Sequence, residues 1–334
     1  MEILKNEFAI ATKLIFIAVQ LLIIALMLMP AFMSSIDLWW LDNLANFQLQ
    51  WTILAIVSVL LNVFFFRILT IPLALIFLSI FLYNFTAFFS AGVSSNQSGA
   101  QFKIAQLNIS YGNPNVDSII LGLIDSDYDA VLIQEIADRE VDKFAQLLVG
   151  FPYSIGSNSL DSFSSRLALF SRWPMLNRRI HDLGYVEGKV IEVTLAPADG
   201  NIPVRILALH PGAPRSPDLW GLRNATLEFI AAEVSSSSLP HQIVIGDVNV
   251  SPWSPFFRNL VRNSGLQDGV SGHGYIPSWS AFTTNNLMRL LSSTYIDHCL
   301  VSHSIAVRGK DLRFIEGSDH LLIENSLELN QVPD

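Results

Sequence analysis

The pattern of apolar and polar positions divides the chain into two unlike parts. Three almost uncharged stretches come first, and each is about as long as the 20 mainly apolar residues that a membrane-spanning helix needs. Beyond residue 100, short apolar runs alternate with segments of helical spacing. We therefore predict a membrane anchor in residues 1–91 with three transmembrane helices (at about 14–35, 47–66 and 69–90), a tether at 92–101 and a folded domain at 102–330.

The first apolar stretch has two other interpretations. A secretory signal peptide has an apolar run of about 7–15 residues, but this run is longer and two more stretches follow it. A buried helical hairpin within a soluble protein is the second alternative. Polar side chains inside the stretches are few and do not resemble an ion or proton pathway. We therefore interpret the segment as an anchor.

The second part of the chain predicts a mixed structure of strands and helices, typical of an α/β or α+β sandwich. The predicted helices are Val116–Ile124, Val141–Leu148 and Leu219–Val234, the last with Asp218 as a possible N-cap. The predicted strands are Phe102–Leu107, Ala130–Gln134, Leu167–Phe170, Val190–Leu195, Val204–Leu209, Gln242–Ile245, Tyr295–Val301, Ala306–Phe314 and Leu321–Leu327.

The distribution of charged residues supports the division of the chain into two parts. Only 15% of the residues are charged, against roughly a quarter in an ordinary soluble protein. Three of the 20 basic and four of the 29 acidic residues lie in residues 1–95, which leaves the remainder with 17 basic and 25 acidic residues, a net charge of −8. The chain is therefore neither disordered nor a basic protein that coats nucleic acid. It is not a disulfide scaffold either, because Cys299 is its single cysteine and is expected in the core.

The basic residues near the spans predict the orientation. Lys5 and Lys13 precede the first span and Arg67 separates the second from the third, whereas the connection between the first two spans carries Asp37 and Asp42. Basic residues favour the cytoplasmic side. We expect a multi-pass membrane protein with a cytoplasmic N-terminus and Arg67, and with residue 91 onward outside the cytoplasm.

Polar side chains recur where the predicted strands of the domain end. Any one of them has a structural explanation as a cap, a turn or a loop residue, but together they are harder to dismiss, because strand ends that face one rim build binding sites. These residues are Asn108 after IAQL, Glu135 after AVLIQ, His210 after ILAL, Asp247 and Asn249 after IVIG, Asp297 within YIDHCLV, and Asp319 and His320 before LLI.

This set of side chains suits metal-assisted attack on phosphorus. Carboxylate and amide oxygens are ligands for a hard cation such as Mg²⁺ or Mn²⁺. A histidine backed by a carboxylate can act as a general base towards water, and further amides and a second histidine can stabilise phosphoryl oxygens. The sequence has no HExxH motif, GxSxG elbow, Walker A loop or GxGxxG motif.

These residues resemble the endonuclease/exonuclease/phosphatase superfamily, with its deoxyribonuclease I-like fold. The resemblance covers about residues 102–327, and its GD-x-N element followed by SDH is specific in combination. GDVN stands where GDFN is commoner, and PSWS where PTWP is expected in bacterial membrane-anchored members. The segments that carry it are AQLNISYGNPN, VLIQEI, LFSRWP, LALHPGAP, VIGDVNVSPWS, PSW, YIDHCLVS and GSDHLLI.

The resemblance implies a four-layer α-β-β-α sandwich and a role for each strand-end residue. Glu135 would be the principal metal carboxylate, assisted by Asn108, with Asp319 as a further metal or site carboxylate. Asp247 and Asn249 would position the nucleophile and the phosphate. His320 would be the general base, oriented by Asp297, and His210 would contact the phosphate or protonate the leaving group. His298 would point to the opposite face.

The sequence leaves two classes of substrate open. A membrane-anchored phosphodiesterase could act on a lipid or lipid-linked phosphate, or on nucleic acid outside the cytoplasm, although net charge −8 disfavours polyanions. Arg172 is expected either to reach a phosphate or to stay solvated, and Trp279 either to form part of an apolar rim of the site or to pack in a loop core. The bilayer is the expected partner, and no obligate protein partner is implied. The alternative from another class is a catalytically silent, membrane-tethered binding module.

Overall fold

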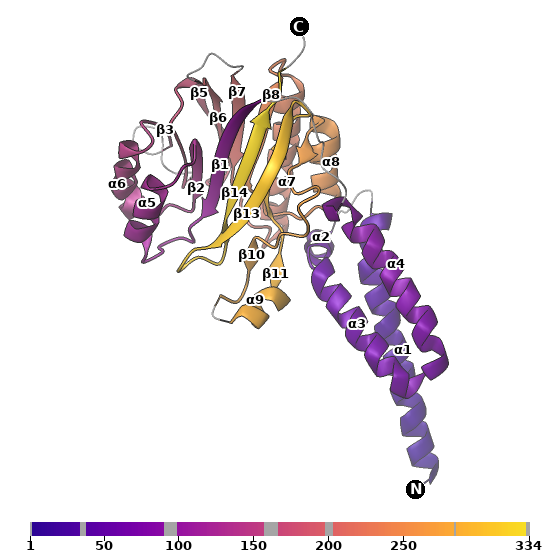
Figure 1. The fold of residues 1–334 in the computed structure, drawn as a ribbon. Helices are drawn as coiled ribbons and strands as arrows, with labels where there is room; N and C mark the ends of the chain where they lie inside the picture. Colours follow the sequence, from indigo (N-terminus) through magenta and orange to yellow (C-terminus); the bar gives the residue numbers. More distant parts are fainter. Residues whose placement is uncertain are drawn as a thin grey trace.

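A computed structural model describes residues 2–33, 38–89, 99–156, 166–197, 203–283 and 285–331. Figure 1 shows a helical bundle projecting from one end of a larger α/β domain. The predicted tether lies mainly outside the described residues. Strand β1 begins at Ala100, two residues before the predicted start of the domain. The backbone nitrogen of Gly99 already donates a hydrogen bond to the Glu328 carboxylate at 2.6 Å.

Three helices of the bundle are long and apolar enough to cross a membrane, as predicted, over Asn6–Phe32, Gln48–Phe65 and Arg67–Phe89. Lys13 lies 5.9 Å from the ring of Phe66, so both basic positions, Lys13 and Arg67, lie at the end of the bundle away from the domain (Figure 1). The elements are α1 (Glu2–Phe32), the short α2 (Trp39–Ala45), α3 (Gln48–Phe65), η1 (Arg67–Leu69) and α4 (Thr70–Phe89).

Polar side chains inside the bundle form hydrogen bonds from one helix to another. Gln20 of α1 donates to Asn62 of α3 at 3.3 Å, and Asn84 of α4 donates to Gln48 of α3 at 3.0 Å. Such bonds hold helices together in an apolar medium, where each unpaired polar group is costly. Their pairing fits a structural anchor.

The domain contains two six-stranded mixed sheets and a small two-stranded one. The first sheet runs in the order β13 (Ile305–Phe314), β14 (Leu321–Leu329), β1 (Ala100–Asn108), β2 (Ala130–Gln134), β4 (Leu167–Ser171) and β3 (Tyr153–Ile155). The second runs in the order β5 (Met175–Asp182), β6 (Lys189–Leu195), β7 (Val204–Leu209), β8 (His241–Asp247), β12 (Asp297–Val301) and β9 (Gln267–Asp268). The small sheet pairs β10 (Trp279–Ser280) with β11 (Ser293–Thr294).

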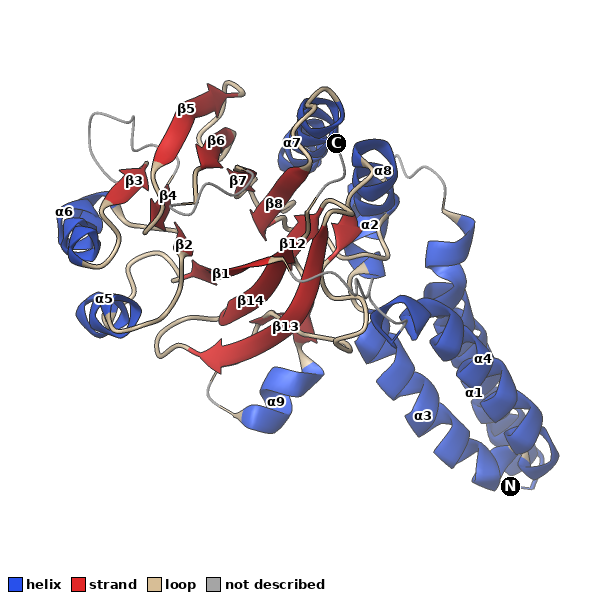
Figure 2. Ribbon diagram, turned by 45° about the horizontal axis from the view of Figure 1, so that its top comes forward, coloured by secondary structure: helices blue, strands red, loops and turns tan. Residues whose placement is uncertain are grey.

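The two large sheets pack face to face, with helices outside, which gives the four layers that the resemblance implied (Figure 2). Phe102, Ile104 and Leu132 of one sheet meet Ile206 and Ile245 of the other in the central core. The helices that cover the first sheet are α5 (Val116–Ile124) and α6 (Val141–Phe144), and those that cover the second are α7 (Pro217–Ser235) and α8 (Pro255–Ser264). Cys299 is buried in the central core, as expected.

Several predicted elements have the predicted bounds, and others differ for local reasons. Helix α7 begins at Pro217, and Ser216 rather than Asp218 is its N-cap, because the Ser216 hydroxyl accepts from the backbone nitrogen of Leu219. The predicted helix 141–148 is one α-helical turn followed by the 3₁₀ helix η3 (Ala145–Val149). Strand β5 was not predicted, because as an edge strand exposed on most positions it lacks an apolar period.

The anchor packs directly on the domain. Phe85 and Phe88 of α4 contact Trp253, with ring centroids 5.1 and 5.7 Å apart. Phe88 also meets Tyr275 and Tyr295 edge to face. These side chains form one buried apolar cluster with residues of α1 and α2, so the anchor and the domain share a core.

Candidate active site

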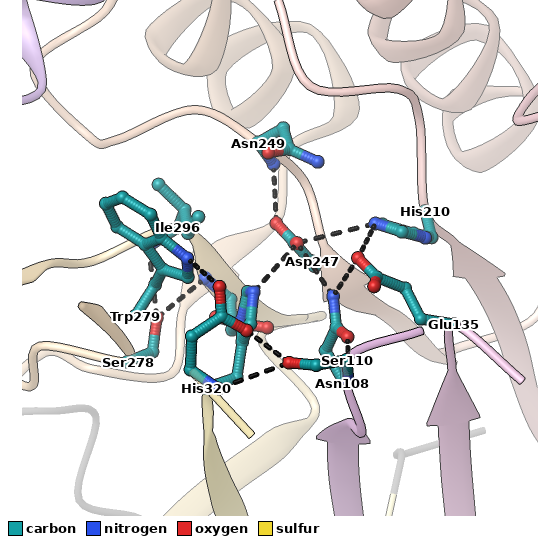
Figure 3. A network of polar contacts seen from close by, with 12 residues as sticks. Asn108, Ser110, Glu135, His210, Asp247, Asn249, Ser278, Trp279, Ile296 and His320 are labelled. Atoms are coloured by element: carbon teal, nitrogen blue, oxygen red, sulfur yellow. Dashed lines mark hydrogen bonds and ion pairs between the residues drawn. The ribbon is translucent and has the colours of Figure 1, made fainter. Parts of the chain in front are cut away.

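The predicted strand-end residues meet at one edge of the sandwich. Strands β1 and β2 are parallel, as are β7 and β8, so their carboxyl ends reach the same edge. Strand β12 is antiparallel to β8 and begins there, with Asp297 opposite Asp247. Strand β14 is antiparallel to β1, which brings His320 to the same place. Figure 3 shows the resulting network of polar side chains.

His320 and Asp297 form a buried pair at this edge. The Nδ1 of His320 lies 2.9 Å from the Asp297 carboxylate, and both side chains are almost completely buried. Burial lowers the pKa of the His320 imidazole, but the Asp297 carboxylate, helped by Asp247 and Asp319, raises this pKa to about 10. Burial raises the pKa of Asp297, and the facing imidazole more than offsets this. Asp297 thus fixes the ring and directs Nε2 towards Asp247.

Asp247 lies between the two histidines. One oxygen of its carboxylate is 3.6 Å from Nε2 of His320 and 3.5 Å from Nε2 of His210. Its other oxygen accepts from the backbone nitrogen of Asn249 at 2.9 Å. Burial lowers the pKa of His210, but the carboxylates of Asp247 and Glu135 raise it above its ordinary value. The two carboxylates therefore favour the protonated form of His210.

Glu135 reaches the site from an unusual backbone conformation. Its backbone φ is +62°. Residues other than glycine rarely adopt a positive φ, and those that do are often found at functional sites. One carboxylate oxygen accepts from Nδ2 of Asn108 at 3.0 Å, and the other accepts from the backbone nitrogen of Tyr111 at 2.9 Å. The same Asn108 amide donates to Asp247 at 3.3 Å, so the Glu135 and Asp247 carboxylates converge on one amide.

Asp319 and Trp279 flank this centre. The indole nitrogen of Trp279 donates to one Asp319 oxygen at 2.8 Å, and the Ser110 hydroxyl donates to the other. Trp279 also forms a β-bridge with His320. The indole of Trp279 therefore positions Asp319, and the Trp279 backbone positions the segment that carries the histidine.

The site lies in a cleft of about 680 Å³. Glu135, His210, Asp247 and His320 line it together with Asn249, Asp319 and Trp279. Arg166 and Tyr111 also line the cleft, and the Arg166 guanidinium lies 4.3 Å from the Tyr111 ring centroid. Three further lining residues, Asn43, Asn46 and Phe47, come from the anchor.

The structure does not bring Arg172 to the site. Strand β4 is antiparallel to β2, so its carboxyl end lies at the edge opposite Glu135. There Arg172 donates to the backbone oxygens of Tyr128 and Ser126 at 2.7 and 2.8 Å. The interpretation of Arg172 as a phosphate ligand is therefore wrong. His298 points away as expected, and its Nε2 lies 2.8 Å from the Val250 carbonyl oxygen.

Several residues of the domain at the site were not predicted, among them Ser110, Tyr111, Arg166 and Ser278. Ser110 and Ser278 lie inside the motif segments, where Ser110 bonds Asp319 and the Ser278 hydroxyl accepts from the backbone nitrogen of Asp297 at 3.1 Å. Tyr111 also lies in such a segment, so attention to the whole motif would have found these three. Arg166 lies outside the motif segments, so its position in the chain gives no signal of its role.

The donor chemistry of the site fits a hard divalent cation. Glu135 and Asp247 provide carboxylate oxygens around the Asn108 amide, and oxygen ligands are what Mg²⁺ and Mn²⁺ prefer. Asp319 lies at the same edge, where its two oxygens accept hydrogen bonds from the Ser110 hydroxyl and the Trp279 indole. Asp247, Asp297 and His320 offer ligand atoms within 4.8 Å of one another, but Asp297 already occupies Nδ1 of the histidine.

Comparisons with known proteins agree with this geometry. A family model described as "Endonuclease/Exonuclease/phosphatase family" matches residues 105–320. An endonuclease/exonuclease/phosphatase from Beutenbergia cavernae has a TM-score of 0.53 at 16% identity, covering 69% of this chain and 72% of its own. A 3′ phosphatase from Neisseria, solved with a product DNA hairpin, has a TM-score of 0.54 at 18% identity over 67% of this chain and 98% of its own.

A conserved protein of unknown function from Enterococcus faecalis is similar as well, with a TM-score of 0.55 at 16% identity over 69% of this chain and all of its own. Comparison with curated proteins finds no match. At these identities the solved structures show the fold alone. They confirm the sandwich predicted from the sequence.

Proposed function

The chain belongs to the endonuclease/exonuclease/phosphatase family, and from this we propose that it hydrolyses phosphodiesters with an activated water and a divalent cation. Family membership supports a hydrolase of phosphate esters in general. The observation that carries the finer proposal is the buried Asp297–His320 pair, in which Nε2 of His320 lies at the cleft, 3.6 Å from Asp247. A general base needs this combination of an oriented ring and access to water.

In the proposed reaction His320 takes a proton from water at Nε2, and the water oxygen forms a bond to phosphorus. The ester bond on the other side of phosphorus breaks, and the leaving oxygen receives a proton from His210, whose pKa is lowered by burial but raised overall by the Asp247 and Glu135 carboxylates. Asp247 and Asn249 hold the water and the phosphate. A hard cation held by Glu135 and Asn108 would offset the negative charge of the phosphoryl oxygens.

The competing hypothesis is a catalytically silent binding module. A silent module would be expected to have lost a carboxylate or the base from the cleft. Glu135, Asp247 and His320 all line the same cleft at contact distances that fit their proposed roles. The presence of all three side chains in the cleft favours an enzyme over a silent binding module.

Metal removal tests the proposal. Without a cation, the carboxylates hold the proton on His320 up to a pH of about 10, so the base is blocked at neutral pH. A positive ion among these carboxylates lowers the pKa of the imidazole. We therefore expect the full-length protein to hydrolyse bis-(p-nitrophenyl) phosphate only with Mg²⁺ or Mn²⁺, with a rate that rises as pH rises through the lowered pKa of His320. Equal rates with and without a chelator would contradict the proposal.

We also propose that the domain lies outside the cytoplasm. The N-terminus and Arg67 lie at the end of the bundle opposite the domain (Figure 1), and basic residues favour the cytoplasmic end of a span. A reporter enzyme fused after residue 96 should be active only when the reporter is one that works outside the cytoplasm. Activity of a cytoplasmic reporter at that position would reverse the orientation.

A further inference from the structure

The anchor supplies part of the wall of the active-site cleft. Asn43, Asn46 and Phe47 line the cleft together with His320 and Glu135, although 88 residues or more separate them from these groups in the sequence. We propose that this anchor wall, defined as Asn43, Asn46 and Phe47, determines specificity, and that the substrate is the phosphodiester of a bilayer lipid held at headgroup level. This inference rests on the proposed function and names its substrate class.

Hydrogen bonds fix the anchor wall to the domain. Nδ2 of Asn43 donates to the Pro214 carbonyl oxygen at 2.8 Å. Asn46 accepts twice, at its side chain from the Ser251 nitrogen at 3.1 Å and at its backbone oxygen from the Thr294 hydroxyl at 2.8 Å. Pro214 and Thr294 also line the cleft, so the wall is joined to the rest of the lining on two sides.

A buried ion pair connects the wall to a residue of the site. Asp42 of α2 pairs with Arg223 of α7 at 2.5 Å, and neither side chain is more than 1% exposed. Asp42 also accepts from the Trp220 indole at 2.9 Å and from the Ser254 hydroxyl at 2.6 Å. Arg223 in turn donates to the backbone oxygen of Asn249 at 2.9 Å. One chain of contacts therefore runs from the anchor to the loop that positions the phosphate.

The wall lies where lipid phosphates lie. Phe47 directly precedes α3, whose 18 residues (Gln48–Phe65) span about 27 Å at 1.5 Å per residue. This matches the roughly 30 Å of a bilayer's hydrocarbon core. If α3 spans that core, Phe47 and the cleft beside it lie in the headgroup layer, so a lipid reaches the site without leaving the bilayer.

The short helix α9 (Asn286–Leu291) extends this membrane-facing side of the domain. Leu287 and Leu290 are 63% and 52% exposed, and Phe282 just before the helix is 51% exposed. Gln50 in the first turn of α3 donates to the Ser293 carbonyl oxygen at 2.7 Å, just after α9. Figures 1 and 2 both show α9 on the side from which the bundle projects. Apolar side chains exposed at this level suit contact with a bilayer surface.

The charge of the cleft favours a lipid substrate over nucleic acid. A lipid presents a single phosphodiester, whereas nucleic acid is bound through many Lys and Arg contacts along its backbone. Among the described residues, the arginines lining the cleft are Arg166 and Arg215, set against four acidic side chains. The domain as a whole carries net charge −8. This balance suits one small anionic group and not a polyanion.

The test compares two substrates in one preparation. Full-length protein is reconstituted in vesicles of phosphatidylethanolamine and phosphatidylglycerol, and the hydrolysis of vesicle lipid and of soluble bis-(p-nitrophenyl) phosphate is measured with Mn²⁺. Phe47→Ala should lower lipid hydrolysis at least about tenfold more than hydrolysis of the soluble ester, because it removes apolar contact that only the lipid makes. Phe47→Leu should restore most of the loss.

Two further variants keep the test decisive. Leu60→Ala removes an apolar side chain that is 62% exposed in the middle of α3, and it should change neither rate. Leu287→Ser with Leu290→Ser alters only exposed positions, so it tests the lipid-to-ester ratio even if Phe47→Ala does not fold. Phe47→Ala and the Leu287→Ser, Leu290→Ser double variant should shift this ratio in the same direction.

The outcomes separate the inference from the proposed function. If the soluble ester and an oligonucleotide are hydrolysed but vesicle lipid is not, the lipid inference is overturned and the phosphodiesterase stands. An equal loss on both substrates in the Phe47 and α9 variants also overturns the inference. If wild-type protein hydrolyses no phosphodiester with either metal, the proposed function itself fails.

Discussion

Replacing His320 with alanine should lower kcat for bis-(p-nitrophenyl) phosphate by about 10³-fold, within the range expected for loss of a general base. The variant removes the imidazole whose Nδ1 is held by the buried Asp297 carboxylate and whose Nε2 lies at the cleft, 3.6 Å from Asp247. KM should change little, because the groups proposed to hold the phosphate remain. Steady-state kinetics of the full-length protein in detergent with Mn²⁺ measure both constants.

His303 is the matched control. It is exposed on the surface and lies outside the cleft, so His303→Ala should leave kcat within about twofold of the wild-type value. Glu135→Ala should be as damaging as His320→Ala, since it removes a carboxylate from the centre around Asn108. Survival of activity in both the His320 and the Glu135 variants would show that the proposed mechanism is wrong.

The second large effect is expected from Asp42→Ala. This change leaves the Arg223 guanidinium buried without a counter-charge, which costs about 3–5 kcal/mol of the free energy of unfolding. It also leaves the Trp220 indole and the Ser254 hydroxyl without their acceptor. For a domain of this size we expect Tm to fall by about 10 °C, as measured by tryptophan fluorescence of the full-length protein.

Asp117→Ala is the matched control for this prediction. Asp117 pairs with Lys143 on the surface, with side chains 69% and 46% exposed, and exposed pairs contribute at most about 1 kcal/mol. Replacing both buried partners, with Asp42→Leu and Arg223→Met, removes the unpaired charge and should recover part of the lost Tm. If Asp42→Ala lowers Tm no more than Asp117→Ala, the ion pair does not hold the anchor on the domain.

Much of the site could be predicted because its signal is local. A polar residue directly after a buried apolar run is visible in one sequence, and the endings at Asn108, Glu135 and Asp247 share this form. Parallel strands then bring such endings to one edge. The direction of β4 carries no comparable signal. Its antiparallel pairing with β2 sends Arg172 to the far edge, and for this reason the expectation for Arg172 failed.

The contact between anchor and domain could not be predicted for a different reason. Asp42 was interpreted only as an acidic residue in the connection between spans, yet its partner Arg223 lies 181 residues further along the chain. A pairing at that separation leaves no periodicity in the sequence. Trp253 likewise follows the motif loop, but its indole nitrogen bonds the Asn84 carbonyl oxygen in α4 at 2.9 Å. A domain expected on a tether is instead docked.

The most direct test of the proposed hydrolysis is to follow the attacking oxygen. Full-length protein with Mn²⁺ should hydrolyse bis-(p-nitrophenyl) phosphate in water enriched in the heavy oxygen isotope, and mass spectrometry should find one heavy oxygen in the p-nitrophenyl phosphate product and none in p-nitrophenol. The His320→Ala protein should form almost no labelled product in the same time. Label in p-nitrophenol, or labelled phosphate ester formed equally fast without His320, would contradict attack on phosphorus by a water that His320 activates.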